Sequence, residues 1–193
     1  ARPAPCDTAR MRLAEKVRHF AGDRAEVFMT MRYGKPSLKQ WISDHARRYE
    51  MVRILPLYPH YSSSTTRTIE ELLRKEWRQH QGTAYPLIIK QFWNHPGYLE
   101  ALAGQVREHD TSSFDQVVLS YHGLPERQVN ACHPGRTVGR CSCEHEMPAD
   151  GALCYRATCY ATSRWIIREL GLPPDRVTTA FQSRLSKNWL RPF

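Results

Sequence analysis

Residues 115–125, DQVVLSYHGLP, decide the fold class and point to a functional position. The first seven of them form a short apolar run with the length of a buried strand, which stops at His122 and Gly123. Near-continuous apolar strands are typical of parallel sheets that are covered on both faces. Ligands of open α/β sheets bind beyond the carboxyl ends of the strands, so His122 stands where a functional residue is expected. The competing interpretation is a loop histidine that caps the turn before Gly123.

The rest of the chain alternates apolar runs with amphipathic stretches. The predicted strands are 25–31, 51–58, 85–92, 115–121 and 176–182. Four predicted helices have both ends assigned, at 7 or 8 to about 19, 66–79, 96–107 with Pro96 near its start, and 159–170. A further helix is predicted to follow Ser37, which would be its cap. Strict alternation of this kind predicts an α/β fold with parallel sheets flanked by helices.

The composition limits the classes of protein to which this chain can belong. The 193 residues are 41% hydrophobic and 24% charged, as in ordinary soluble domains, and contain no apolar run long enough for a membrane span. The opening residues lack the apolar core of a signal peptide, so a cytoplasmic location is expected. The net charge of +9 favours anionic partners, with peripheral contact to an acidic membrane among them. Because the basic residues are scattered, nucleic acid is not the expected partner.

Polar and aromatic residues follow four of the predicted strands. These strand ends are 31–34 (MRYG), 58–62 (YPHYS), 120–125 (SYHGLP) and 181–184 (FQSR), with Trp189 just beyond the last. Each also has a plain structural reading, since the tyrosines could pack in a core, Arg32 could pair with a carboxylate, and the Ser/Thr run at 62–66 could cap a helix. Taken together they predict one aromatic and basic rim that contains a histidine.

Several of these segments resemble the signature sequences of the ferrochelatases, the family that inserts Fe(II) into a porphyrin to complete haem. The matching segments are MRYGKPS (31–37), LPLYPHYSSSTT (55–66), HPGYLEALA (95–103), LSYHGLPER (119–127) and FQSRLSKNWLRPF (181–193). Their order and spacing also fit, so the resemblance extends over nearly the whole chain. It implies two Rossmann-like lobes that meet at a cleft, the first spanning about residues 1–110 and the second 111–193.

The resemblance also implies roles for individual residues. His122 stands at the family's metal-site and proton-accepting position, which suits an imidazole because the porphyrin must lose two pyrrole protons as iron enters. The same imidazole can ligate Fe(II). The implied porphyrin-binding residues are Arg32, Tyr33, Tyr58, Tyr61, Ser62 and Trp189. Aromatic walls of this kind can hold the macrocycle bent, and arginine suits its propionates.

The sequence also departs from the family pattern. It begins after the family's opening strand and glycine-rich lip, and it stops just past the Trp-Leu motif. The part of the family that carries an acidic partner for the histidine therefore lies outside it, which suggests an internal fragment. Leu185 and Ser186 stand where the family has glycine after the QSR segment.

Five cysteines lie close together in an apparent insertion at about 130–154 and just after it. Their spacing is C-x8-C-x-C-x10-C-x4-C, and four thiolates from one irregular loop suit zinc or an iron–sulfur cluster, with free thiols as the remaining interpretation. Some bacterial ferrochelatases carry a [2Fe-2S] cluster in an insertion here, so the resemblance favours that cofactor. The expected ligands are Cys132, Cys141, Cys143 and Cys154, with Cys159 in reserve and His133 and His145 as weaker alternatives. Stabilisation of the fold and redox sensing are both open as its purpose.

The leading interpretation is an enzyme that inserts Fe(II) into protoporphyrin IX or coproporphyrin III. A chelatase for another divalent metal is a second possibility on the same fold. A third, from a different class, is a non-catalytic iron–sulfur or zinc module that is derived from the enzyme and senses metal or redox state.

Overall fold

The computed structural model describes residues 5–81, 84–132 and 135–192. By its contacts the chain divides into two compact units, of which the first comprises residues 1–52 and 69–87 and the second residues 53–68 and 88–193. Each unit thus combines two separate stretches of the sequence. The predicted boundary between two lobes near residue 110 stays a prediction. Within the described residues, no helix combines the length and the apolar character that crossing a bilayer requires.

The first unit is helical. It contains α1 (Pro5–Ala21), the short 3₁₀ helix η1 (Gly22–Arg24), α2 (Leu38–His45) and most of α3 (Thr66–Gln79). The predicted cap of α2 is confirmed, because the Ser37 side chain accepts a hydrogen bond from the Gln40 amide at 3.4 Å. Its core contains Leu38 and Ile42 of α2, and Leu73 and Trp77 on one face of α3.

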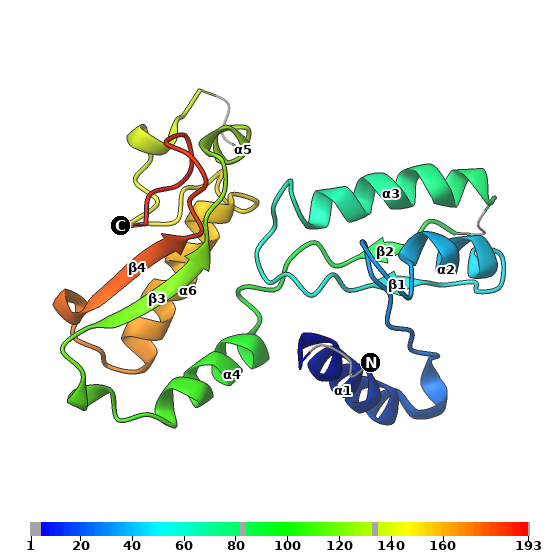
Figure 1. The fold of residues 1–193 in the computed structure, drawn as a ribbon, viewed down its shortest axis with the longest axis horizontal. Helices are drawn as coiled ribbons and strands as arrows, with labels where there is room; N and C mark the ends of the chain where they lie inside the picture. The colour runs from blue at the N-terminus through cyan, green and yellow to red at the C-terminus, as the bar shows by residue number, and fades with distance from the viewer. Residues whose placement is uncertain (1–4, 82–83, 133–134, 193) are drawn as a thin grey trace. The chain divides into compact units, whose positions relative to one another are not determined.

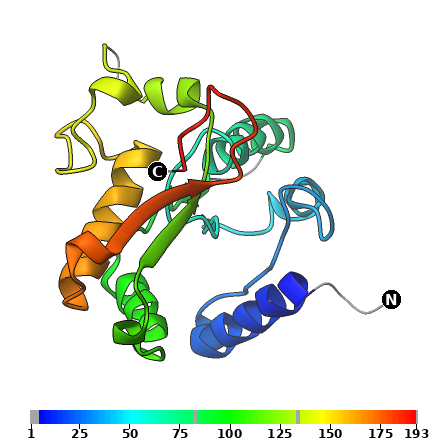
Figure 2. The same ribbon diagram turned by 60° about the vertical axis from the view of Figure 1, so that its left-hand side comes forward.

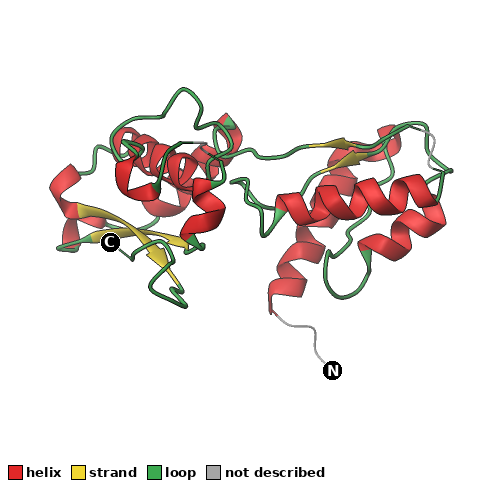
Figure 3. Cartoon of the chain, turned by 90° about the horizontal axis from the view of Figure 1, so that it is seen from above, coloured by secondary structure: helices red, strands yellow, loops and turns green. Residues whose placement is uncertain are grey.

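The strands of the first half of the chain are much shorter than predicted. β1 (Arg53–Ile54) pairs with β2 (Leu87–Ile88), and the Leu87 and Ile89 amides donate to the carbonyls of Val52 and Ile54, each at 2.9 Å (Figure 3). Both sets of residue numbers rise together, so the two strands are parallel.

The prediction of a buried strand over 25–31 is wrong. These residues are exposed or half-buried, and only Met31 forms an isolated bridge, to Ser37. The physical reason is that a strand needs a neighbour for its backbone hydrogen bonds, and apolar residues alone do not supply one. The same reason limits β1 and β2 to two residues each within their predicted ranges.

The second unit has an α/β core. β3 (Val117–His122) and β4 (Val177–Gln182) are parallel, in a register that runs from Val117 opposite Val177 to His122 opposite Gln182. Helix α6 (Tyr155–Glu169) lies along one face of this sheet, next to α4 (Pro96–Arg107) (Figures 1 and 2). The predicted α/β class with parallel strands and flanking helices is therefore confirmed.

The apparent insertion lies between β3 and α6. It follows α5 (Glu126–Asn130), and apart from the 3₁₀ helix η3 (Val138–Arg140) its described residues form turns and irregular loop. The 3₁₀ helices η2 (Thr111–Ser113) and η4 (Pro174–Arg176) precede the two strands. Although the segment is irregular, it is packed into the core, because Cys143 and Cys154 are buried together with Leu124, Phe181 and Leu190.

Candidate functional site

His122 is the last residue of β3, and its side chain is exposed. Both polar atoms of the peptide group that follows it are hydrogen-bonded. The His122 carbonyl accepts from the Tyr155 hydroxyl at 2.8 Å, and the Gly123 amide donates to the Gln182 carbonyl at 2.7 Å. The backbone at the strand end is thus fixed, while the imidazole faces solvent.

Gly123 permits the close approach of β3 and β4 at this point. A Cβ atom at residue 123 would lie 2.6 Å from the Gln182 carbonyl oxygen, well inside van der Waals contact. Only glycine fits here without a shift of the backbone. Glycine at position 123 is therefore required by the local geometry, whatever the chemistry of His122.

The chain beyond β4 turns back to lie beside the residues that follow His122. The Leu190 amide donates to the Leu124 carbonyl and the Glu126 amide to the Asn188 carbonyl, each at 2.9 Å. Trp189, between these contacts, is half-buried and forms an antiparallel bridge with Pro125. The segments at 119–126 and 182–190 thus form one structure at the carboxyl end of the sheet.

The segment that follows β1 joins the same structure through His60. This histidine is buried, its Nε2 atom lies 3.1 Å from the Thr162 hydroxyl, and its ring meets the rings of Tyr121 and Tyr155 edge-on at 5.5 and 6.0 Å. Burial lowers the pKa of His60 from 6.5 to about 4, so the ring is neutral at physiological pH. A second link is made by the Ser64 hydroxyl, which donates to Gln128 Oε1 at 2.5 Å.

Three predicted porphyrin-binding residues lie on this segment. Tyr58 is exposed, Tyr61 is half-buried and Ser62 is buried. The Ser62 hydroxyl is 2.7 Å from the Thr65 hydroxyl, and its carbonyl accepts from the Arg67 amide at 3.2 Å. Ser62 therefore helps to begin α3, as the helix-capping interpretation of the Ser/Thr run expects, and its role toward a porphyrin stays a prediction.

Arg32 and Tyr33 belong to the first unit, in a tight loop between Met31 and Leu38. The loop is closed by the Met31 amide, which donates to the Pro36 carbonyl at 2.7 Å, and by the Leu38 amide, which donates to the Met31 carbonyl at 2.9 Å. The Arg32 guanidinium lies 4.5 Å from the centre of the exposed Tyr33 ring. The cation thus stacks on the aromatic ring, and the role of both residues in porphyrin binding stays a prediction.

Four cysteines of the insertion lie near one another, and the last of them, Cys154, is the N-cap residue at the start of α6. Cys143 and Cys154 are buried, Cys132 and Cys141 are half-buried, and all four are free thiols. Burial raises the pKa of Cys143 to about 12 and that of Cys154 to about 11. Cys141 interacts with both of these thiols, and Cys132 interacts with Cys154, so the four sulfurs belong to one group.

The cysteine group borders a small cavity. Cys141, Cys143 and Cys154 line a small cavity of about 10 Å³ together with Arg156. Across residues 5–81, 84–132 and 135–192, no three His, Cys, Asp or Glu side chains are arranged as they would be around a metal ion. The thiols are therefore neighbours without the geometry of a formed metal site.

The remaining candidate ligands fit this group less well. Cys159 is fully buried, interacts with Cys154 and Cys143 and is hydrogen-bonded to Tyr155, but it does not line the cavity. His145 is exposed, and His133 lies outside the described residues.

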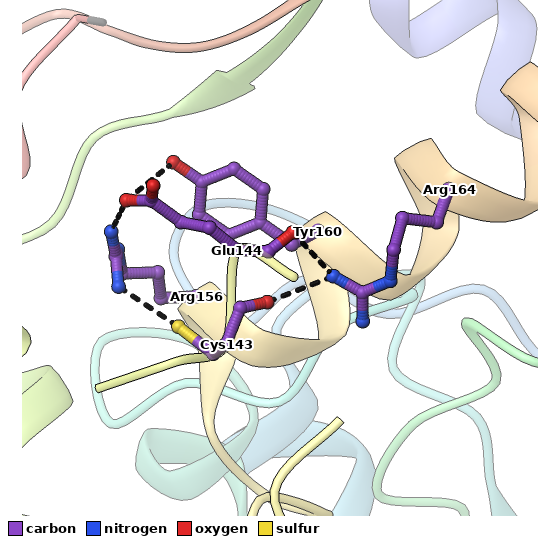
Figure 4. A network of polar contacts seen from close by, with 5 residues as sticks. All are labelled: Cys143, Glu144, Arg156, Tyr160 and Arg164. Atoms are coloured by element: carbon purple, nitrogen blue, oxygen red, sulfur yellow. Dashed lines mark hydrogen bonds and ion pairs between the residues drawn. The ribbon is translucent and has the colours of Figure 1, made fainter. Parts of the chain in front are cut away.

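Two arginines of α6 hold the Cys143-Glu144 dipeptide (Figure 4). Arg156 Nη1 donates to the Cys143 sulfur at 2.9 Å, and the other end of its guanidinium pairs with Glu144, which also accepts from the Tyr160 hydroxyl at 3.3 Å. Arg164 donates to the Cys143 and Glu144 carbonyls at 2.9 and 2.8 Å. The guanidinium lowers the pKa of the Cys143 thiol, but burial raises it by more, so the cysteine is a neutral thiol here. The four cysteines are nevertheless the donor type that zinc or an iron–sulfur cluster takes, and Arg156 would stabilise a bound thiolate.

A cavity of about 710 Å³ lies in the second unit, between β3 and α4. Its lining includes Leu119, Tyr121, Tyr98 and His60. None of the predicted catalytic or porphyrin-binding residues lines it. Because Pro59, His60, Ser120 and Tyr121 also line it, this cavity adjoins the strand-end site.

Sequence reasoning missed three residues that support the site, namely His60, Tyr155 and Arg156. His60 stands inside a quoted segment but received no role, because its partner Thr162 is 102 residues away in the sequence. The sequence does contain a signal for Arg156, because it is a basic residue only two positions after Cys154 and so can reach another cysteine of the same group.

Comparisons with known proteins address the whole chain. The family model described as Ferrochelatase matches residues 4–193. A ferrochelatase of Pseudomonas fluorescens strain Pf-5 is 34% identical over 187 residues, which are 94% of this chain and 55% of the relative. Those of Pseudomonas fluorescens biotype C and Stutzerimonas stutzeri are 36% and 34% identical over 172 and 190 residues, or 86% and 94% of this chain and 50% and 54% of the relatives. The chain thus spans about half the length of these curated relatives.

Proposed function

Because this chain belongs to the ferrochelatase family, we propose that it forms part of an enzyme that inserts Fe(II) into a porphyrin to make haem. One observation carries the proposal. Three segments that are far apart in the sequence, 58–64, 119–128 and 182–190, meet around the carboxyl ends of β3 and β4. In an α/β fold this is the place where a ligand-binding site is expected.

His122 is the proposed proton acceptor and a proposed ligand of the incoming iron. A porphyrin loses two pyrrole protons when Fe(II) enters, and a neutral imidazole is a suitable base near neutral pH. The side chain of His122 is exposed, and the backbone at its strand end is held by hydrogen bonds. A residue that contacts a flat macrocycle needs both an accessible side chain and a fixed position. An imidazole nitrogen is also a good ligand for Fe(II).

The porphyrin is proposed to lie against Tyr58, Tyr61 and Trp189, and Arg32 and Tyr33 of the first unit are proposed porphyrin-binding residues as well. The exposed and half-buried rings of these aromatic residues offer apolar surface to the macrocycle. Arg32 suits the negative propionate groups, and the net charge of +9 acts in the same direction. Protoporphyrin IX and coproporphyrin III share this chemistry, so the assay should offer both.

The test is an anaerobic assay of metal insertion by the full-length protein. We expect His122→Ala to lower the rate of Fe(II) insertion by roughly 10²- to 10⁴-fold, the range of a general base, while porphyrin binding followed by fluorescence changes little. The control is His19→Ala, at an exposed position on α1. A wild-type protein that binds porphyrin but inserts no iron would instead favour the sensor module, and a preference for another divalent metal would favour the second chelatase.

We further propose that Cys132, Cys141, Cys143 and Cys154 hold a [2Fe-2S] cluster. The proposal is supported by the grouping of these four thiols and by the hydrogen bond from Arg156 to the Cys143 sulfur. Four cysteine thiolates are the ligand set that such a cluster requires, and when bound it supplies one-electron redox chemistry. Its ligation would also join the insertion to the start of α6.

Absorption spectra and iron and sulfide assays on anaerobically purified protein test the cluster. We expect red-brown protein with about two irons and two sulfides per chain. Serine at any of the four positions should remove the colour, whereas Cys159→Ser should keep it. Colourless protein that contains zinc or no metal would contradict the proposal.

The site of action is proposed to be the cytoplasm, with peripheral contact to acidic membranes. The net charge of +9 supports this contact, because anionic headgroups attract basic proteins. Sedimentation with vesicles that contain phosphatidylserine, compared with purely zwitterionic vesicles, tests it. Equal binding to both vesicle types, or none, would contradict it.

A further inference from the structure

The strand end that carries His122 depends on one side chain of α6. Tyr155 is the first residue of this helix, and its hydroxyl donates to the His122 carbonyl at 2.8 Å. The other polar atom of the same peptide group, the Gly123 amide, is held by β4 at 2.7 Å. Two hydrogen bonds from two different elements therefore fix the plane of this peptide, and with it the backbone angle ψ of His122.

The angle ψ sets the direction of the side chain relative to the sheet. A rotation about the Cα–C bond of His122 would move the peptide plane away from Tyr155 and Gln182, and would break at least one of the two hydrogen bonds. While both are present, the Cα–Cβ bond of His122 has one direction relative to β4 and α6. An imidazole that must meet pyrrole nitrogens needs this kind of fixed geometry.

Tyr155 is itself held in place. Its ring meets the buried His60 ring edge-on at 6.0 Å and lies 6.4 Å from the ring of Phe181, which is 2% exposed. The helix that begins with Tyr155 is anchored by the Thr158 amide and hydroxyl, which both donate to the Cys154 carbonyl, at 3.0 and 3.1 Å. Its hydroxyl is thus a fixed donor rather than a mobile surface group.

We propose that Tyr155 is a positioning residue for the metal-insertion reaction, because its hydroxyl orients the strand end from which His122 acts. The inference rests on the proposed function of His122. Tyr155 does not need to touch the porphyrin or the iron. Since it directly follows Cys154, it also connects the cysteine group to the strand end that carries His122.

Tyr155→Phe in the full-length protein is the direct test, because it removes the hydroxyl and keeps the ring. We expect kcat for Fe(II) insertion to fall by roughly 10- to 100-fold, while KM for the porphyrin stays within about twofold, since a misplacement of reacting groups acts on the chemical step. The matched control is Tyr98→Phe, a half-buried tyrosine of α4 whose ring packs on Phe92 at 5.3 Å. Its kcat should equal that of the wild type.

A second readout does not depend on activity. In protein labelled with ¹⁵N-histidine, we expect a single set of His122 imidazole signals in the wild type and in Tyr98→Phe. Tyr155→Phe should shift or split this set, because the strand end gains alternative orientations. The His122→Ala variant identifies the signals, and its activity tests the proposed function separately.

The outcomes separate the inference from its premise. A Tyr155→Phe protein with wild-type kcat and unchanged His122 signals would overturn the inference. A lower melting temperature with unchanged kcat would do the same, because the role of Tyr155 would then be structural only. If His122→Ala stays active while Tyr155→Phe still perturbs the His122 signals, the proposed function fails and the geometric inference stands.

Discussion

Alanine at position 123 is the sharpest perturbation that the strand-end geometry offers. The added Cβ atom would lie 2.6 Å from the Gln182 carbonyl oxygen, whereas ordinary contacts begin at 3.4 Å, so β3 and β4 must separate by about 0.8 Å there. That shift breaks or lengthens the 2.7 Å hydrogen bond from the Gly123 amide and moves His122. We expect roughly 1–3 kcal/mol less stability, as for other overpacked sites. A displacement near 1 Å also predicts up to about 100-fold lower insertion activity.

The assays are a thermal melt and the anaerobic insertion rate of the full-length protein. Gly104→Ala is the matched control, because this glycine lies within α4 and has open space around its Cβ position. There alanine should stabilise the helix by roughly 0.5–1 kcal/mol and leave activity unchanged. If Gly123→Ala kept wild-type stability and activity, the close approach of the two strands would not position His122, and the reasoning would be refuted.

The other predictions concern His60 and Arg156, two of the three supporting residues that sequence reasoning missed. The pKa of His60 is about 4 in the folded protein against 6.5 for an exposed histidine, so the unfolded chain binds more protons between these values. The free energy of unfolding should therefore fall by about 3 kcal/mol as the pH drops from 6.5 to 4. In thermal melts at several pH values, His60→Gln should flatten this dependence. The control His109→Gln, at an exposed position, should not. Arg156→Met should lower the midpoint potential of the proposed cluster in a redox titration, because the guanidinium at the Cys143 sulfur stabilises added negative charge. The control Arg168→Met, at an exposed position near the end of α6, should leave the potential unchanged. An unchanged potential in Arg156→Met would contradict that role.

The elements that are determined locally could be predicted from the sequence. Helices α3 and α4 have the predicted bounds, because the apolar period of one and the proline at the start of the other are signals within the segment itself. Strands β3 and β4 were found for a similar reason, as compact apolar runs that end in polar residues. His122 could be singled out because its place at a strand end follows from these runs.

Features that depend on distant partners could not be predicted. The run 25–31 is as apolar as a strand, but its hydrogen bonds need a neighbour that the pattern does not identify. Helix α6 begins at Tyr155 rather than 159, since its first turn is held by Cys154 and by contacts with the strand end. The burial of His60 depends on Thr162, which is far away in the sequence.

The central claim is that the strand-end site around His122 inserts iron into a porphyrin. The most direct measurement compares the anaerobic Fe(II)-insertion rate of the full-length wild type with that of His122→Ala at saturating porphyrin, with fluorescence binding measured on the same samples. The account predicts that both proteins bind the porphyrin and that only the wild type forms haem at an appreciable rate. Equal rates of haem formation by the two proteins would contradict it.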